Sequence, residues 1–306
     1  MRIAIVGLGG VGGVVGSRLA KLIDSGCEVV FWCRGETLKA IRSEGLRVSN
    51  GGESAVVRPT LATCDASEAG KADLLIFATK GYHLEAAAKE TAPLATEKTV
   101  AIPLLNGVSA ASVLEKHLPG SDVLEGCIYV SAHTEAPGTV RQAGSVLRVL
   151  FGKRGIGEAE NRRRYGDLER TLQQSGLNIT LTDRIDVEVW SKFLFLSPFA
   201  GVTTLTGRSI SEVLDDAESA GTVTRMIREA EALAGAKGIA LPENIESLTL
   251  EKARAFPPLT KTSMQVDREK GKATDLEFLI GYVCGEARAL NIPTPAYDAV
   301  YSALRG

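Results

Sequence analysis

The chain has 306 residues, of which 44% are hydrophobic and 24% are charged, and this is the composition of an ordinary globular protein. Because the length exceeds what a single hydrophobic core usually supports, we expect two domains. Lys and Arg total 35 against 37 Asp and Glu, so the formal net charge of −2 gives no positive field that would attract nucleic acid. No run approaches the roughly 18 apolar residues that a membrane span requires, so we expect no association with a membrane.

Cysteine and histidine are sparse in the chain. The five cysteines are odd in number and include no Cys-x-x-Cys pair, which predicts reduced, packed thiols. The three histidines show no His-x-His or His-x-x-x-His spacing, so we expect no metal site. The apolar stretch after Arg2 is interrupted by six glycines between residues 3 and 16, a pattern that a signal peptide does not favour. We therefore expect a cytoplasmic protein.

In the first half of the chain, short β-branched runs alternate with helical patterns, which predicts a mostly parallel sheet covered by helices on both faces. The expected strands are Arg2–Val6, Glu28–Cys33, Asp73–Thr79, Thr99–Leu104 and Val123–Val130. The expected helices lie near 10–24, 37–44, 83–94 and 109–118. The sequence Asn50-Gly51-Gly52, between runs 46–49 and 55–60, predicts a β-hairpin, because Asn-Gly readily adopts the positive φ angles of a tight hairpin turn.

In the second half, the pattern changes from strands to helices. Strands are expected at 139–142 and 146–151, and a helix at 159–174 ends before Gly176. After Asp183 almost only helical periodicity occurs, with helices near 184–206, 209–237, 243–254 and 274–290. The capping boxes Ser209-x-x-Glu212 and Thr274-x-x-Glu277 support two of these helix starts. We therefore expect a first domain at 1–182 and an α-helical domain at 183–306.

The first expected strand runs directly into a glycine-rich loop. This loop, Gly7-Leu8-Gly9-Gly10-Val11-Gly12, has the Gly-x-Gly-x-x-Gly spacing and opens a helical pattern. Gly7 permits the tight turn, Gly9 lets a pyrophosphate approach the backbone, and Gly12 lets helix and strand pack closely. The alternative is a glycine-rich turn without a ligand. The loop predicts a Rossmann-type, doubly wound α/β domain that binds a dinucleotide.

The second strand ends at a residue that bears on the choice of nicotinamide cofactor. NAD enzymes usually place a carboxylate there, to bind the ribose 2′-hydroxyl. This chain has Arg34, whose guanidinium can grip the 2′-phosphate of NADP. We therefore expect NADP(H), with a solvated Arg34 beside Glu36 as the alternative.

Polar residues also follow later strands, where ligands bind in open α/β sheets. Lys80 could contact the cofactor, or it could be an exposed lysine. Asn106 could hold a ribose hydroxyl or orient a catalytic ammonium group, or it could be a turn asparagine before glycine. Ala132 and His133 follow the last strand of the expected sheet. Ala132 is a candidate cofactor contact, whereas a structural role is the stronger expectation for His133.

One lysine stands on an apolar helix pattern. Lys192 has Phe195, Leu196 and Ala200 at the i+3, i+4 and i+8 positions. Partial removal from water disfavours the charged form of an ammonium, which suits it to give a proton at neutral pH. Such a group could stabilise and protonate the oxygen of a carbonyl that receives hydride. The alternative is that Lys192 reaches water or pairs with Glu188.

Taken in order, these motifs resemble the ketopantoate reductase (2-dehydropantoate 2-reductase) family along essentially the whole chain. The matching residues are the glycine loop, Arg34, Lys80, Leu105-Asn106-Gly107, Trp190-Ser191-Lys192, Ser263-Met264 and Thr274-Asp275-Leu276-Glu277. The resemblance implies an N-terminal Rossmann domain and a helical C-terminal domain. It places the catalytic lysine at Lys192, the catalytic acid at Asp275, cofactor contacts at Arg34, Lys80 and Asn106, and a substrate contact at Ser263. Lys192, Asn106 and Glu277 are further candidates for contact with the substrate.

The chain departs from the family pattern at several of these places. The usual Glu-x-Asp order is reversed to Asp275-x-Glu277, so Glu277 could act in place of Asp275, or both could only favour a helix N-terminus. Where the family typically has asparagines, this chain has Leu196, Ala200 and Ile280. A pocket without these amides would hold the hydroxyl and carboxylate of ketopantoate less specifically.

We therefore expect NADPH-dependent reduction of a 2-oxo acid, with ketopantoate as the leading substrate. Two alternatives stay open: reduction of another branched 2-oxo acid, and a non-catalytic NADP-binding regulatory protein. The expected partner is a small molecule, and the apolar helices of the second domain could supply a homodimer interface.

Overall fold

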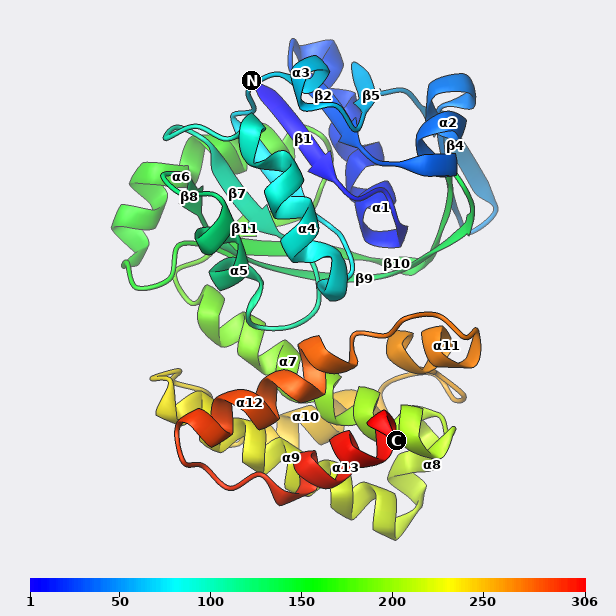
Figure 1. Ribbon diagram of the computed structural model, residues 1–306, viewed down its shortest axis with the longest axis vertical. Helices are drawn as coiled ribbons and strands as arrows, with labels where there is room; N and C mark the ends of the chain where they lie inside the picture. Colours follow the sequence, from blue (N-terminus) through cyan, green and yellow to red (C-terminus); the bar gives the residue numbers. More distant parts are fainter. The chain divides into compact units, whose positions relative to one another are not determined.

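The computed structural model describes all 306 residues, and the chain divides into two compact units. The first unit comprises 1–105 and 110–185, and the second comprises 106–109 and 186–306 (Figure 1). Residues 106–109 lie within the range predicted for the first domain but cluster with the second unit. Each unit is described by itself below.

The first unit is built on a six-stranded sheet in which all neighbouring strands are parallel. Its strands are β1 (Arg2–Val6), β2 (Glu28–Trp32), β5 (Leu61–Thr63), β6 (Leu74–Phe77), β7 (Val100–Pro103) and β8 (Asp122–Val123). The spatial order is β5-β2-β1-β6-β7-β8. Counted within this sheet alone, the order is 3-2-1-4-5-6, which confirms the Rossmann-type prediction.

A second sheet adjoins this core within the same unit. Its strands are β3 (Leu46–Asn50), β4 (Glu53–Val57), β9 (Glu125–Ala136), β10 (Thr139–Gly152) and β11 (Ile179–Leu181). The predicted hairpin is confirmed, because β3 and β4 are antiparallel and both Gly51 and Gly52 have positive φ angles, of 56° and 95°. The strand predicted at 123–130 is wrong in its placement: only β8 continues the parallel sheet, while β9 pairs antiparallel with β10.

One other sequence prediction for this unit needs correction, and the strand β5 was missed. The strands expected at 139–142 and 146–151 form one strand, β10, whose register shifts between Ala143 and Leu147. Gly144, with a φ of 71°, lies in this irregular stretch and lets the strand continue through it. The three-residue strand β5 was not predicted, because it is too short to show alternation.

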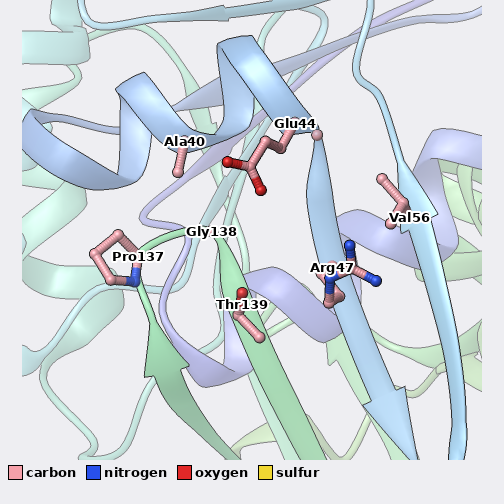
Figure 2. A pocket seen from close by; sticks show the side chains of 8 residues that line it. Ala40, Glu44, Arg47, Val56, Pro137, Gly138 and Thr139 are labelled. Carbon is pink, nitrogen blue, oxygen red and sulfur yellow. The ribbon is translucent and has the colours of Figure 1, made fainter.

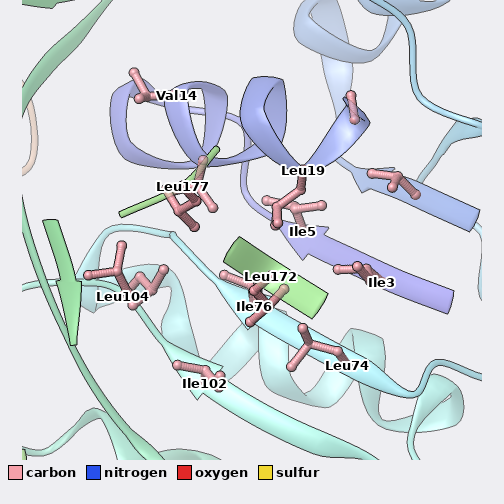
Figure 3. Close-up of a cluster of buried hydrophobic side chains, with 14 of the residues drawn as sticks. Ile3, Ile5, Val14, Leu19, Leu74, Ile76, Ile102, Leu104, Leu172 and Leu177 are labelled. Carbon is pink, nitrogen blue, oxygen red and sulfur yellow. The ribbon is translucent and has the colours of Figure 1, made fainter. Parts of the chain in front are cut away.

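The helices of the first unit bury one core against the parallel sheet. They are α1 (Gly10–Leu19), α2 (Gly35–Glu44), α3 (Ala66–Ala69), α4 (Gly81–Thr91), α5 (Ala110–His117) and α6 (Glu158–Gln173), with short 3-10 turns η1 (Ala20–Ser25) and η2 (Ala92–Leu94). Side chains of β1, β6 and β7 meet α1 and α6 in this core, including Ile5, Ile76, Ile102, Leu19 and Leu172 (Figure 3). Such burial is the main favourable term in folding, and it fixes the sheet from which the glycine loop extends.

The regular elements of the second unit are all helices, as predicted, and the segment 106–109 is a loop. Its elements are α7 (Ile185–Thr206), α8 (Ile210–Asp215), α9 (Ala217–Ala236), α10 (Ile245–Arg254), α11 (Ser263–Glu269), the π-helical turn η3 (Glu277–Gly281), α12 (Tyr282–Ala289) and α13 (Pro295–Arg305). Helix α9 packs against α8, α10, α12 and α13. Phe193, Phe199 and Ala200 of α7 are all buried, as expected for a helix whose apolar residues occur all round.

The helix starts of this unit agree only in part with those predicted from the sequence. The Ser209–Glu212 capping box is present, since Glu212 accepts from the Ser209 backbone N–H and the Ser209 side chain accepts from the Glu212 N–H. The helix expected at 209–237 is interrupted at Asp216, whose carboxylate caps α9 by accepting from the Ser219 N–H. No helix in the structure is long and apolar enough to span a bilayer.

Candidate active site

The glycine loop lies where β1 ends and α1 begins. Gly7 has a φ of 94°, a conformation that favours glycine, and its N–H donates to the Trp32 carbonyl of neighbouring β2. A Cβ at position 12 would lie 1.8 Å from the carbonyl oxygen of Gly7, so only glycine permits this approach of helix to strand. A Cβ at position 10 would lie 2.5 Å from the carbonyl oxygen of Ala132, so β9 passes directly beside the loop.

Gly9 differs from the other loop glycines, because a Cβ there would have no neighbour within 4 Å. Gly9 is the N-cap of α1, where no side chain caps the helix and no acidic residue stands in the first turn. The loop therefore offers open space beside uncapped backbone N–H groups, which fits the pyrophosphate of a dinucleotide. Leu8 is buried in the core, so only its backbone is available to such a ligand, whereas Val11 is half-buried.

The neighbouring strand β6 ends beside the loop. The strand order reverses between β1 and β6, because β2 and β5 lie on one side of β1 and the later strands lie on the other. Ligands bind at this point of doubly wound folds. Thr79 follows β6 with its methyl group against Gly7, and its buried hydroxyl has no hydrogen-bond partner. Lys80 is the N-cap of α4 and is half-buried. The sequence prediction named Lys80 but missed Thr79. The available signal was that Thr79, like Lys80, comes just after a strand.

Arg34 follows the end of β2 and precedes α2. Its guanidinium donates to the carboxylate of Glu90 across 2.9 Å, and 56% of the side chain is exposed. An ion pair this exposed contributes little stability, so Glu90 is only a weak competitor for the guanidinium. Glu36, the acid noted beside Arg34 in the sequence, pairs instead with Lys39.

His133, the histidine that follows the last strand of the expected sheet, lies on β9 and is exposed.

In the second unit, Lys192 of α7 and Asn106 are in direct contact. The Lys192 Nζ donates to the Asn106 Oδ1 across 3.1 Å. Lys192 is half-buried, and Phe193 and Phe195, which follow it in α7, are buried. Of the roles that the sequence left open for Asn106, this contact matches the orientation of an ammonium group.

Asp275 and Glu277 have different surroundings. Asp275 is buried, whereas 67% of the Glu277 side chain is exposed. Glu277 accepts from the Tyr301 hydroxyl across 2.7 Å. The predicted Thr274–Glu277 capping box is wrong: the segment enters a π-helical turn that has no side-chain cap. The structure therefore separates two acids that the sequence could not distinguish.

The remaining predicted residues of this unit also differ in exposure. Ser263 is exposed in the first turn of α11, after Thr262, whose hydroxyl caps the helix by accepting from the Gln265 N–H. Ala200 and Ile280, at two of the positions where asparagines were expected, are fully buried, and Leu196 is half-buried. The side chains of Ala200 and Ile280 therefore lie in the interior of the second unit, whereas that of Leu196 is partly accessible.

A separate small pocket lies in the first unit. Figure 2 shows it between α2, the β3–β4 hairpin and the turn that joins β9 to β10. It is lined by Ala40, Glu44, Gly45, Arg47, Val56, Pro137, Gly138 and Thr139. None of the predicted site residues lines this pocket, so it has no part in the candidate site.

Comparison with known protein families identifies both halves of the chain. Residues 3–155 match the model of ketopantoate reductase PanE/ApbA, and residues 184–306 match the model of the ketopantoate reductase PanE/ApbA C terminal. The chain belongs to the ketopantoate reductase family. It is therefore an oxidoreductase that acts on a CH–OH group, and the resemblance and the enzyme class predicted from the sequence are confirmed. The family supports reduction of an oxo acid with a nicotinamide cofactor.

Individual relatives agree with this assignment. The 2-dehydropantoate 2-reductase of Halobacterium salinarum is 28% identical, and the alignment covers 100% of this chain and 98% of the relative. The crystal structure of 2-dehydropantoate 2-reductase from Porphyromonas gingivalis W83 is 30% identical with a TM-score of 0.83, and the match covers 100% and 99% of the two chains. A ternary structure of D-mandelate dehydrogenase with NADH and anilino(oxo)acetate has the same fold, with 24% identity, a TM-score of 0.87 and coverage of 100% and 97%.

Proposed function

We propose that this member of the ketopantoate reductase family uses NADPH to reduce the keto group of a 2-oxo acid, with ketopantoate as the leading substrate. The observation that carries the proposal is the half-buried Lys192 ammonium held by Asn106. Ketopantoate is the substrate named for several relatives, among them the reductases of H. salinarum and P. gingivalis.

The first unit supplies the residues that would hold the cofactor. The open backbone at Gly9 and the uncapped start of α1 would receive the pyrophosphate, and Arg34 would grip the 2′-phosphate. Lys80 and Ala132 border the same end of the sheet, and the unpartnered Thr79 hydroxyl adds a hydrogen-bonding group there. When bound, NADPH supplies the hydride.

The second unit supplies the proton and the substrate contacts. As negative charge develops on the substrate oxygen, the Lys192 ammonium stabilises that charge and gives its proton to the oxygen. Asn106 orients the ammonium by accepting one of its hydrogen bonds. The hydroxyl of Ser263 would contact the substrate carboxylate, and the buried Asp275 is a better candidate than Glu277 for the functional acid.

A second candidate substrate class is a 2-oxo acid with a less polar side chain. Leu196 is half-buried and offers no hydrogen bond where the family typically has an asparagine, whereas Ala200 and Ile280 are fully buried. An apolar contact at Leu196 would favour a substrate group that is itself apolar. The structural neighbour D-mandelate dehydrogenase is described with an aromatic oxo acid derivative and NADH. An aromatic 2-oxo acid and NADH therefore belong in the test.

The test is NADPH and NADH oxidation, followed by absorbance, with ketopantoate, other branched 2-oxo acids and an aromatic 2-oxo acid. The proposal predicts the highest kcat/KM for ketopantoate with NADPH. Preference for a hydroxyl-free 2-oxo acid would favour the second candidate, and no turnover of any 2-oxo acid would contradict both.

The cofactor preference can be tested with Arg34→Ala. Loss of a charge-assisted contact worth ~1.5–3 kcal/mol should raise the KM for NADPH about 10- to 100-fold and leave that for NADH unchanged. Glu90→Gln is the matched control, because it removes the same ion pair and keeps the guanidinium. An equal effect of Arg34→Ala on both cofactors would contradict the 2′-phosphate contact.

A further inference from the structure

The segment 106–109 is held against the π-helical turn η3. Gly107 has a φ of 103°, and a Cβ at this position would lie 2.5 Å and 2.6 Å from the Cε1 and Cδ1 atoms of Phe278. These distances are far below van der Waals contact, so the backbone at Gly107 approaches the ring more closely than any other residue type allows. Asn106, the neighbour of Gly107, is the residue that accepts from Lys192.

Phe278 is half-buried, and the turn that carries it has an anchored backbone. Its neighbours Leu279 and Ile280 are buried, and the Leu279 N–H donates to the Asp275 carbonyl across 2.9 Å. The Tyr282 N–H bonds to the Glu277 carbonyl five residues earlier, which is the hydrogen bond of a π-helix. The ring therefore projects from a segment that is anchored in the core of the second unit.

We infer that Phe278 and Gly107 are positioning residues, which hold the 106–109 segment so that the Asn106 Oδ1 meets the Lys192 ammonium. The inference rests on the proposed function, in which Lys192 gives the proton. Catalytic groups need geometry within about 0.5 Å of the productive one, so a shift of the loop away from the ring misorients the ammonium. The π-helical turn also begins two residues after Asp275. The same element therefore positions both Asn106 and Asp275.

The first experiment is a double-mutant cycle on kcat with Phe278→Leu and Asn106→Ala. Phe278→Leu should lower kcat on the order of 10- to 100-fold, as expected for a small displacement of a catalytic group. Because Phe278 acts through Asn106, the double variant should be no slower than Asn106→Ala alone. Additive losses, or a normal kcat in Phe278→Leu, would overturn the inference.

Gly107→Ala tests the other side of the contact and has a matched control. Gly207 also has a positive φ, of 73°, but a Cβ there would have no neighbour within 4 Å. Gly207→Ala therefore introduces the same kind of backbone strain without touching Phe278, and it should keep the wild-type kcat. If Gly107→Ala and Gly207→Ala lowered kcat equally, the loss would come from backbone strain and not from the contact with Phe278.

A second readout does not depend on turnover. Reductive methylation of Lys192, quantified by peptide mass spectrometry in the full-length protein, should be faster in Asn106→Ala, Phe278→Leu and Gly107→Ala than in the wild type and in Gly207→Ala. If the wild type reduces no 2-oxo acid, the proposed function fails while this labelling still tests the contact. Wild-type labelling rates in Phe278→Leu and Gly107→Ala would refute the positioning role.

Discussion

The Lys192 Nζ donates to the Asn106 Oδ1 across 3.1 Å, although the two residues are 86 positions apart in the sequence. One lies on α7 and the other in a short segment between β7 and α5 that joins the same unit. The contact gives the ammonium a neutral acceptor, which restrains its direction without adding a negative charge that would hold its proton more tightly.

The hydrogen bond between Lys192 and Asn106 predicts different effects for two substitutions of Asn106. Asn106→Ala removes the acceptor and should lower kcat about 10-fold or more, since a hydrogen bond to a charged group contributes ~1.5–3 kcal/mol. Asn106→Asp keeps an acceptor but adds a carboxylate, which should raise the pKa of the Lys192 ammonium and move the basic limb of the kcat profile to higher pH. The pH dependence of kcat for the two variants checks this, and an unmoved basic limb in Asn106→Asp would count against a titrating Lys192.

The different burial of the two acids predicts which of them acts. Asp275→Asn should lower kcat/KM by about two orders of magnitude, in the range of a lost acid–base or orienting group. Glu277→Gln should have little effect, because Glu277 is exposed and bonded to Tyr301. Steady-state kinetics of both variants test this prediction. A larger loss of kcat/KM in Glu277→Gln than in Asp275→Asn would assign the functional role to Glu277.

Substitutions in the glycine loop should have two separable effects, one on the stability of the fold and one on the binding of NADPH. Gly12→Ala should destabilise the fold by about 1–3 kcal/mol or more, because the new methyl group would collide with the Gly7 carbonyl. Gly9→Ala should fold with nearly wild-type stability, since its methyl group enters open space, yet it should bind NADPH more weakly. Chemical denaturation and NADPH titration distinguish the two effects. Undiminished NADPH binding by a folded Gly9→Ala variant would argue against a pyrophosphate at this loop.

The capping box of α8 predicts a pH-dependent contribution to stability. Hydrogen bonds from the Ser209 backbone N–H and hydroxyl hold the pKa of Glu212 below its ordinary value of 4.5. A group whose pKa is lowered by folding stabilises the protein above the ordinary pKa, and this contribution disappears as the pH falls through the folded value. Glu212→Gln should therefore lower Tm at neutral pH and have a smaller effect in acid. A Tm difference that does not depend on pH would contradict this assignment.

Local sequence signals predicted the parts of the fold that depend on local interactions. Strand β1, the glycine loop and the start of α1 follow from residues 2–12, and the β3–β4 hairpin and the Ser209 cap have similarly local causes. The long β9–β10 pair was misread because its partners are set by tertiary pairing. Helix α13 was missed although Pro295 at its first position was an available signal.

The candidate site was predictable only as separate residues. The sequence named Lys192, Asn106 and Asp275, but their burial and the contact between the first two depend on how distant segments pack. Phe278 gave no signal at all, because its close approach to Gly107 joins two residues that are far apart in the chain. Thr79 was overlooked because an unpartnered hydroxyl becomes apparent only in three dimensions.

The most direct test of the account is the kcat of Lys192→Ala, measured with NADPH and the best 2-oxo acid beside the dissociation constant for NADPH. If Lys192 gives the proton, kcat should fall about 100- to 10,000-fold, the usual contribution of a general acid, while NADPH binds as in the wild type. A nearly normal kcat in a folded variant that still binds NADPH would show that the proton comes from elsewhere.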